Sequence, residues 1–168
     1  VVREISREVK DGSGVRYQID TFYDANDNVI RKDIQNIDEQ GRLQPNTHVT
    51  TLYEYDILNN MIRMAQEVAL QDTIKTEYAY DNNRNRTLIR YGEATAGRQP
   101  TNIMRTLCDE RDLVFREIRA ASDSKQSTMQ YDYDRNRNLV TWRHGLEDMP
   151  RVSTLVYDAY DRRVSETD

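Results

Sequence analysis

The sequence predicts an all-β protein made of tandem antiparallel β-hairpins that form one twisted, curved sheet. Three observations predict this fold: an aromatic-Asp pair recurs along the chain, an extended β-forming stretch precedes each pair, and polar turn residues with an apolar step follow it. Of the 168 residues, 37% are apolar and 32% are charged, which suits one face of a sheet but not a thick core. We therefore expect a single array over residues 1–168.

An aspartate that follows an aromatic or small apolar residue marks each hairpin. Successive marks lie 24 to 32 residues apart, so the units repeat with connections of variable length. Asp and Asn tolerate positive φ and accept hydrogen bonds from backbone amides two residues ahead, so each aspartate is predicted to close its own turn. The six repeat-turn aspartates are Asp24, Asp56, Asp81, Asp109, Asp134 and Asp158.

The residues before each aspartate predict the first strand of a hairpin. These stretches are rich in Tyr, Thr and other β-formers, which recur at every second position on one face of the strand. After the polar turn residues, an apolar step such as Val29-Ile30 or Met61-Ile62 opens the second strand. The predicted first strands are 16–23, 48–55, 75–80, 102–108, 127–133 and 152–157.

Glycine, proline and small polar residues predict the return connections between hairpins. These connections are 37–46, 92–100, 120–125 and 145–150. Residues 1–9 align with residues 114–121, because Val-Val-Arg-Glu-Ile matches Val-Phe-Arg-Glu-Ile, so we expect the second strand of an incomplete hairpin there. The chain begins without Met or a signal peptide, which predicts a fragment of a longer protein.

The repeated phrases resemble those of a known family. Residues 23–29 read Tyr-Asp-Ala-Asn-Asp-Asn-Val, residues 53–61 read Tyr-Glu-Tyr-Asp-Ile-Leu-Asn-Asn-Met, and residues 131–139 read Tyr-Asp-Tyr-Asp-Arg-Asn-Arg-Asn-Leu. These phrases are similar to the YD repeats of the Rhs family, written YDxxGRL or YDxxGNL. The family includes bacterial Rhs polymorphic toxins, the shell component of Tc toxins, wall-associated proteins and the teneurins. About six units of this kind cover nearly the whole chain.

The resemblance implies a long antiparallel sheet that spirals into a hollow shell, which in the toxins encloses a C-terminal toxic polypeptide. This sequence departs from the family in two ways. It lacks the terminal core signature of the DPxG kind, so neither self-cleavage nor a toxin domain is assigned. The family's Gly, three places after the Asp, is absent from all six units, and a positive φ there would cost an Arg about 1 kcal/mol. The residues at this place are Asp27, Asn59, Arg84, Asp112, Arg137 and Asp161.

Three turns match the first half of a calcium-binding loop. They read Asp-x-Asn-x-Asn, beginning at Asp24, Asp81 and Asp134. Such a loop also needs Gly at its sixth place and Glu at its twelfth, and these three have neither. Hairpin turns explain the pattern better, and we assign no metal and no cofactor.

The sequence gives little reason to expect catalysis or nucleic-acid binding, so we expect the protein not to be an enzyme. His48 and His144 are the only histidines, and neither stands in a recognisable acid-base motif. Cys108 takes the place of a Tyr in its unit and is expected to fill that place as a small apolar residue. A net charge of −5 does not favour nucleic acid, and no apolar run is long enough to span a membrane.

The tyrosines are the feature with a candidate binding role. Tyrosines stacked across strands form a platform on which a sugar ring can lie, and we name six as candidate carbohydrate contacts. The alternative, which we favour, is that cross-strand Tyr pairs hold the sheet together with their hydroxyls bonded to neighbouring backbone. The Arg and Asp residues are likewise expected to pair across strands on a solvated face. The six tyrosines are Tyr53, Tyr55, Tyr78, Tyr80, Tyr131 and Tyr133.

With the resemblance, these observations predict a structural segment of a shell that encloses or presents another polypeptide, for toxin delivery or cell-surface display. The alternative function is an adhesion module that binds carbohydrate or a cell surface through the Tyr-rich face. The expected location is secreted or at the cell surface, on the resemblance alone. The expected partners are the remainder of a longer chain and an enclosed toxin or a surface glycan, and the isolated fragment is expected to self-associate.

Overall fold

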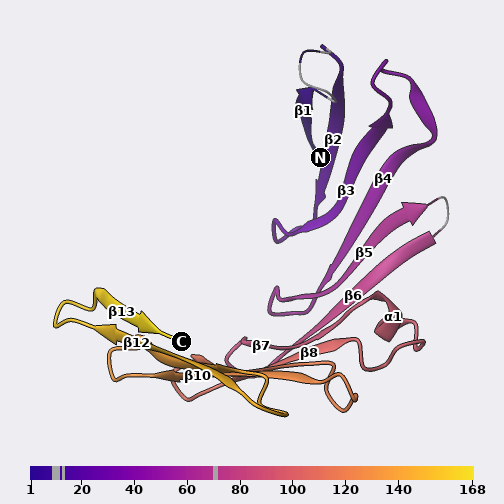
Figure 1. The fold of residues 1–168 in the computed structure, drawn as a ribbon. Coiled ribbons are helices and arrows are strands. Elements are labelled where there is room, and N and C mark those ends of the chain that lie inside the picture. The colour runs from indigo at the N-terminus through magenta and orange to yellow at the C-terminus, as the bar shows by residue number, and fades with distance from the viewer. Residues whose placement is uncertain (9–11, 13, 70–71) are drawn as a thin grey trace. The chain divides into compact units, whose positions relative to one another are not determined.

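The computed structural model describes residues 1–168 except residues 9–11, 13 and 70–71, and for residues 5–8 it describes the backbone. Over this part of the chain the fold is all-β, as predicted, with thirteen strands and one short helix (Figure 1). The strands form one open antiparallel sheet in which spatial order follows chain order from β1 to β13. The elements are β1 Val2–Glu8, β2 Arg16–Tyr23, β3 Val29–Ile37, β4 Leu43–Tyr55, β5 Met61–Ala69, β6 Asp72–Tyr80, β7 Arg86–Arg90, α1 Gly92–Thr95, β8 Ile103–Cys108, β9 Val114–Arg119, β10 Ser127–Tyr133, β11 Leu139–His144, β12 Arg151–Tyr157 and β13 Arg163–Thr167.

The chain divides into two compact units. The first, Val1–Glu77, contains β1 to β5 and most of β6. The second, Tyr78–Asp168, contains the end of β6, the strands β7 to β13 and α1. Each unit is built from the same hairpins, so the local geometry below applies to both.

A β-bulge follows each hairpin turn whose register is described. In β2 and β3, Phe22 pairs with Arg31 but Tyr23 pairs with Val29, so Ile30 is the extra residue. The same shift occurs in the β4–β5, β8–β9, β10–β11 and β12–β13 pairs. In the apolar step Val29-Ile30, the first residue therefore opens the second strand and the second is the bulged residue. A bulge of this kind increases the local twist of the strands.

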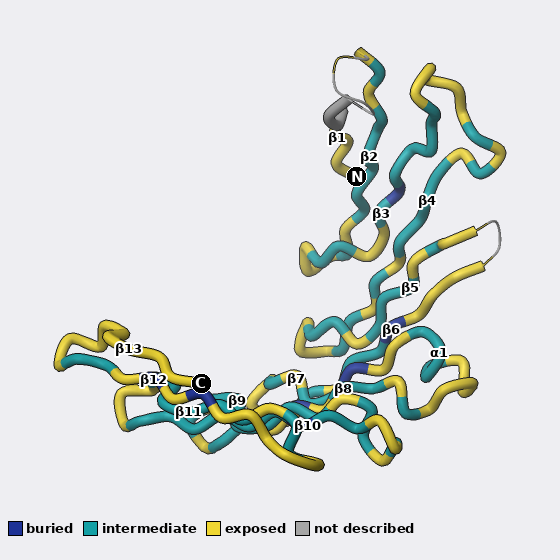
Figure 2. Tube along the Cα trace, in the orientation of Figure 1, coloured by how far each residue is buried: buried dark blue, intermediate teal, exposed yellow. Residues whose placement is uncertain are grey.

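One face of the sheet carries the tyrosines of the repeat, and we call it the tyrosine face. Alternation along the strands places the residue before each Asp, and every second residue before that, on this face. Five of the seven buried residues that the structure describes lie on it: Thr76, Ile89, Thr106, Ser153 and Leu155. The tube in Figure 2 is accordingly mostly intermediate or exposed, as expected for a single layer.

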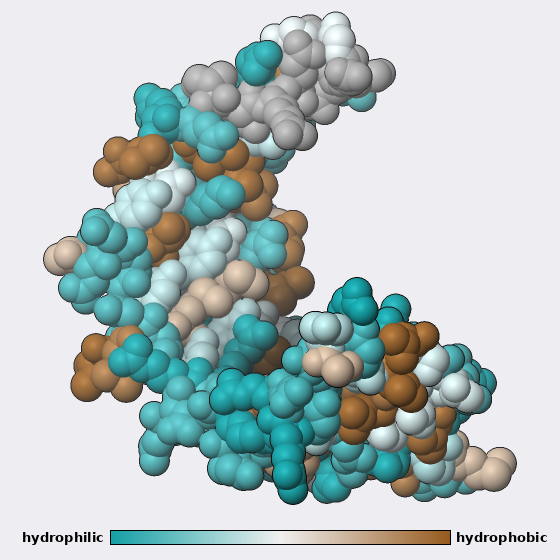
Figure 3. Space-filling model, turned by 90° about the vertical axis from the view of Figure 1, so that its left-hand side faces the viewer, coloured by the Kyte–Doolittle hydropathy of each residue, from teal (hydrophilic) through white to brown (hydrophobic). Residues whose placement is uncertain are grey.

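Arginine and acidic side chains pair across strands on the opposite face. Arg3 and Asp20, which are register partners, lie 2.8 Å apart, and Arg63 reaches both Glu54 at 2.9 Å and Glu77 at 3.3 Å. Arg143 pairs with Asp132 in the same way. These pairs are partly exposed to solvent, which screens them, so each contributes little to stability. Polar and apolar side chains are interspersed on the face drawn in Figure 3.

Two return connections differ from the sequence prediction. Residues 37–46 were expected to form a loop, but β3 continues to Ile37 and β4 begins at Leu43, which leaves a turn of only five residues. The connection 92–100 contains α1, a single helical turn in which Ala96 N–H donates to the carbonyl of Gly92. The strand predicted over residues 1–9 is observed as β1, Val2–Glu8, which pairs with β2. Residue 9 lies outside the described part of the chain.

No helix in the described ranges is both long enough and apolar enough to cross a membrane.

Candidate functional site: the aspartate turns and the tyrosine face

Seven turns in the described part of the chain share one geometry. In each, the Asp N–H donates to the carbonyl four residues ahead, and the N–H three residues ahead donates to the Asp carbonyl. The Asp Oδ1 accepts the backbone N–H groups two and four residues ahead at 2.8–3.0 Å. Six of these aspartates are the predicted ones, and the seventh is Asp38.

The second carboxylate oxygen of each Asp accepts a side chain from its own turn. In four turns the donor is the amide of the Asn four residues ahead, as in Asn138 to Asp134 at 3.0 Å. In the other three turns an Arg takes this role, and Arg162 donates to Asp158 at 2.8 Å. The carboxylate therefore has both oxygens occupied, which makes it the organising group of the turn.

These bonds lower the pKa values of six turn aspartates: Asp24, Asp38, Asp81, Asp109, Asp134 and Asp158. The pKa of Asp24 falls because the amide and backbone N–H of Asn28 both donate to its carboxylate. Burial pushes the pKa of Asp134 upward, but the bonds from Asn138 and Asn136 outweigh it, so the pKa is lowered overall. The ionised form is the one that holds the turn.

Side chains also clamp one turn to the next. The amides of Asn26 and Asn28 donate to Oδ1 of Asn59 at 3.2 and 2.9 Å. The same clamp joins Asn83 and Asn85 to Asp112 at 3.0 and 2.7 Å, and Asn136 and Asn138 to Asp161 at 3.0 and 2.7 Å. The six predicted turns therefore alternate along the chain between a donor turn and an acceptor turn, and the Asp38 turn, in the connection between β3 and β4, belongs to neither kind.

This alternation gives the Asp-x-Asn-x-Asn pattern a structural explanation. The donor turns begin at Asp24, Asp81 and Asp134, which are the three that resemble half of a calcium loop. Both asparagines of each pattern donate to the following acceptor turn, and the aspartate accepts bonds from its own turn. The pattern thus encodes contact between neighbouring hairpins.

The residue three places after each Asp has positive φ in all seven turns. Arg84 has φ 68°, Arg137 has φ 71° and Asp112 has φ 61°. Asp38 is followed by Gly41 at φ 79°, so the glycine of the family pattern is present in the turn that the sequence analysis took for a return loop. In acceptor turns a glycine at this place would remove the oxygen that receives both asparagines.

Two glycine substitutions are expected to have opposite effects. Arg137→Gly removes a strained φ without losing a clamp acceptor, so the melting temperature should stay constant or rise by about 1–3 °C. Asp112→Gly removes the same kind of strain together with the acceptor for Asn83 and Asn85, so the melting temperature should fall by about 2 °C. Asp112→Asn keeps an acceptor oxygen and serves as the matched control. Thermal unfolding followed by circular dichroism measures all three, and a fall for Arg137→Gly equal to that for Asp112→Gly would contradict the clamp.

Tyrosine hydroxyls join neighbouring hairpins through backbone carbonyls. Tyr55 donates to the carbonyl of Val29 at 3.0 Å, and Tyr133 donates to the carbonyl of Val114 at 2.8 Å. In each case the acceptor is the first residue of the second strand in the preceding hairpin. Burial raises the pKa of both hydroxyls, which remain protonated donors.

The remaining candidate tyrosines lie along the same face. Tyr131 donates to Glu117 at 3.1 Å, and burial with the Glu117 charge raises its pKa to about 12. The Arg86 guanidinium lies 5.3 Å from the centre of the Tyr78 ring. Tyr53 lies near the end of β4 and pairs with Met64 of β5, and Tyr80 ends β6 next to Asp81. The structure therefore does not gather the six tyrosines into one pocket.

Cys108 and the two histidines occupy ordinary positions. Cys108 ends β8 at the repeat's Tyr position, and burial raises the pKa of its thiol, which disfavours the reactive thiolate. His48 lies in β4 with Nδ1 3.0 Å from the Thr47 hydroxyl, and exposed His144 ends β11.

Glu147 is a residue that the sequence analysis did not single out. Its carboxylate accepts the backbone N–H of buried Thr128 at 3.0 Å, the Thr128 hydroxyl, and the Gln126 amide at 3.2 Å. The Thr128 hydroxyl bond is the main reason why the pKa of Glu147 falls to about 2. Glu67 acts similarly by accepting the N–H of Thr50 at 3.1 Å. No local pattern marks either residue, because each acts on a strand distant in sequence.

The comparisons with known proteins find similarity in fold only. No protein-family model matches the chain, and no curated protein matches its sequence. The fold is similar to a crystal structure of TcdB2-TccC3-Cdc42, with a TM-score of 0.55 and 15% identity over 90% of this chain and 10% of that chain. It is also similar to TcdB2-TccC3 without its hypervariable C-terminal region (TM-score 0.54, 16% identity, 90% of this chain, 10% of that chain). A Photorhabdus luminescens Tc holotoxin pore matches with a TM-score of 0.54 and 15% identity over 89% of this chain and 10% of that chain.

These matches place the hairpin array among folds seen in Tc toxin structures. The chain spans about a tenth of the length of the chains that it matches. At 15–16% identity the similarity concerns the fold alone. The matched structures named here give no support to the carbohydrate-adhesion alternative.

Proposed function

We propose that this chain is a structural, non-catalytic segment of a YD-repeat shell that encloses or presents another polypeptide. The observation that carries the proposal is the fold similarity to TcdB2-TccC3, because the match extends over 90% of the chain. The hairpin phrases that resemble YD repeats support the same assignment independently of the fold. We propose a secreted or cell-surface location on the same grounds.

The side-chain chemistry supports a structural role. The asparagines of the donor turns and the hydroxyls of Tyr55 and Tyr133 bond to a neighbouring hairpin, and the turn aspartates hold each turn together. A wall needs such contacts between successive hairpins, since each hairpin touches mainly its neighbours. The partners that we propose are the remainder of a longer chain and a polypeptide enclosed by it.

Protease protection in the full-length gene product tests this role. A polypeptide enclosed by the array should remain uncut under conditions that digest the same polypeptide when it is expressed alone. Cleavage at equal rates in the two contexts would reject enclosure. The isolated 168-residue chain is also expected to self-associate through the edge strands β1 and β13, because their outer backbone groups have no strand beside them within the sheet.

A further inference from the structure

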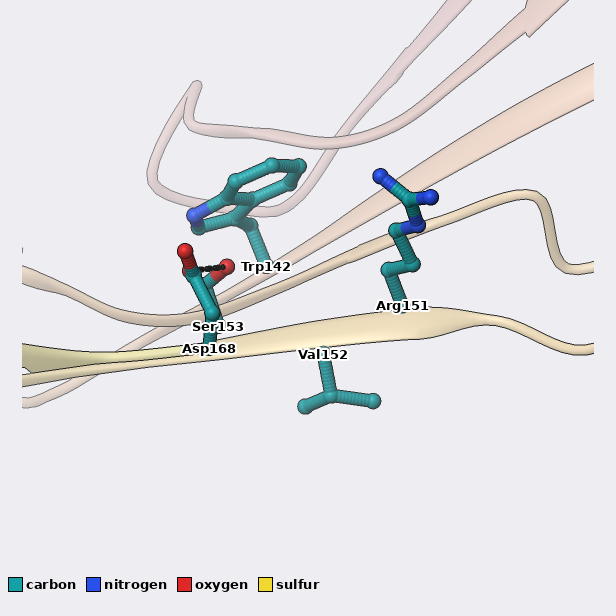
Figure 4. A pocket seen from close by; sticks show the side chains of 5 residues that line it. All are labelled: Trp142, Arg151, Val152, Ser153 and Asp168. Carbon is teal, nitrogen blue, oxygen red and sulfur yellow. Dashed lines mark hydrogen bonds between the residues drawn. The ribbon is translucent and has the colours of Figure 1, made fainter.

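A depression on the tyrosine face of β11 and β12 contains hydrogen-bond donors that have no partner among the residues that the structure describes. It has a volume of about 380 Å³ and is lined by Trp142, Arg151, Val152, Ser153 and Asp168. Figure 4 shows the indole of Trp142 and the side chains of Arg151, Ser153 and Asp168 on one side of the strands, with Val152 on the other. Trp142 and Ser153 are register partners, so the small serine leaves space beside the large ring.

The polar groups around this depression differ in how they are satisfied. Ser153 is only 3% exposed, and its hydroxyl donates to Oδ1 of Asp168 at 2.6 Å, which fixes a carboxylate at one end. Within the described residues, neither the indole N–H of Trp142 nor the guanidinium of Arg151 has a hydrogen-bond or ion-pair partner. Arginines elsewhere on the sheet, such as Arg63 and Arg143, do have acidic partners.

The arrangement specifies the chemistry of a ligand. The indole ring offers an apolar wall, as in most small-molecule sites, where a few polar groups then fix orientation. The Arg151 guanidinium favours a carboxylate, which it can hold through two parallel hydrogen bonds. The Asp168 carboxylate, at the end of the depression away from Arg151 in Figure 4, accepts hydroxyl donors. A compact ring with one apolar face, a carboxylate at one end and hydroxyls at the other meets all three requirements.

We propose that this depression binds a uronic acid unit of an acidic polysaccharide. The ring lies on Trp142, the carboxylate pairs with Arg151, and ring hydroxyls donate to Asp168. This site uses none of the six candidate tyrosines and does not depend on the shell function. A neutral hexose lacks the group that Arg151 requires, so it should bind more weakly.

The fluorescence of Trp142 provides a direct test, because it is the single tryptophan of the chain. Sodium glucuronate added to the 168-residue protein should change the emission saturably, with half-saturation at about 1–10 mM. Glucose, which has the same ring without the carboxylate, should require at least tenfold higher concentration. Acetate, which has the carboxylate without the ring, should give no saturable change.

Two matched arginine variants complete the test. Arg151→Gln should weaken glucuronate binding about tenfold, whereas Arg105→Gln, at an exposed position of β8 on the opposite face, should leave it unchanged. Absence of a saturable change up to about 100 mM glucuronate, equal affinity for glucose, or unchanged binding by Arg151→Gln would each overturn the proposal. Circular dichroism verifies that the variants fold. If Arg151→Gln does not, the glucuronate-to-glucose ratio of the unaltered protein decides the outcome.

Discussion

Replacement of Asp134 by alanine is expected to lower the melting temperature of the protein by about 5 °C. The carboxylate accepts the N–H groups of Asn136 and Asn138 at 2.9 and 2.8 Å and the Asn138 amide at 3.0 Å. Alanine leaves these donors without their acceptor and also frees Asn138, which helps to clamp the following turn at Asp161. The effect should therefore exceed that of an ordinary surface substitution.

Asp148→Ala is the matched control for this experiment. Asp148 is an exposed aspartate in the connection between β11 and β12, and its backbone N–H, not its side chain, makes the turn contact with Gly145. Its replacement should shift the melting temperature by less than about 1 °C. Thermal unfolding of the three proteins by circular dichroism decides the matter, and equal shifts for the two variants would show that Asp134 does not organise its turn.

Acid should destabilise the whole array over a narrow pH range. Hydrogen bonds lower the folded-state pKa of six of the seven turn aspartates, and the pKa of Glu147 falls to about 2. A carboxyl group whose pKa is lowered by folding adds stability above its unfolded pKa of about 4 and loses it as the pH falls through the folded value. The melting temperature should therefore be nearly constant from about pH 7 to 5 and should fall steeply between about pH 4 and 2.

Melting curves recorded at constant ionic strength across this pH range test the prediction. Several turns contain an Asp carboxylate at the same position. Their contributions to the stability of the fold are therefore lost over the same pH interval. Asp134→Asn cannot take up a proton at this site, so its stability should depend less steeply on pH below 4. A melting temperature that stays flat between pH 5 and 3 would show that the turns do not depend on ionised aspartates.

The strands and turns could be predicted because their determinants are local. Each hairpin is encoded within about ten residues by alternating β-formers, an Asp and polar turn residues. The positive φ of the residue three places after the Asp follows from the geometry of this turn. The turn at Asp38 follows the same rule, and Gly41 stands at the required place. It was missed because Ile37 stands before this aspartate, where the six predicted turns have Tyr or Cys.

The contacts between hairpins could not be predicted in the same way. Asn26 and Asn59 are 33 residues apart, and only the register of the intervening strands brings their side chains together. Thr128 and Glu147 meet over 19 residues through a connection without any recognisable pattern. The Asp-x-Asn-x-Asn spacing was visible in the sequence, but its meaning depended on a neighbour whose position the sequence alone does not give.

The alternation of donor and acceptor turns also limits how such a protein can gain or lose repeats. Removal of one hairpin would place a donor turn beside another donor turn, or an acceptor beside an acceptor, and would leave asparagine amides without their oxygen. Removal of two consecutive hairpins would rejoin a donor turn to an acceptor turn and keep the asparagine clamp between them. In genetic terms, the unit of duplication and deletion that preserves this wall is a pair of hairpins.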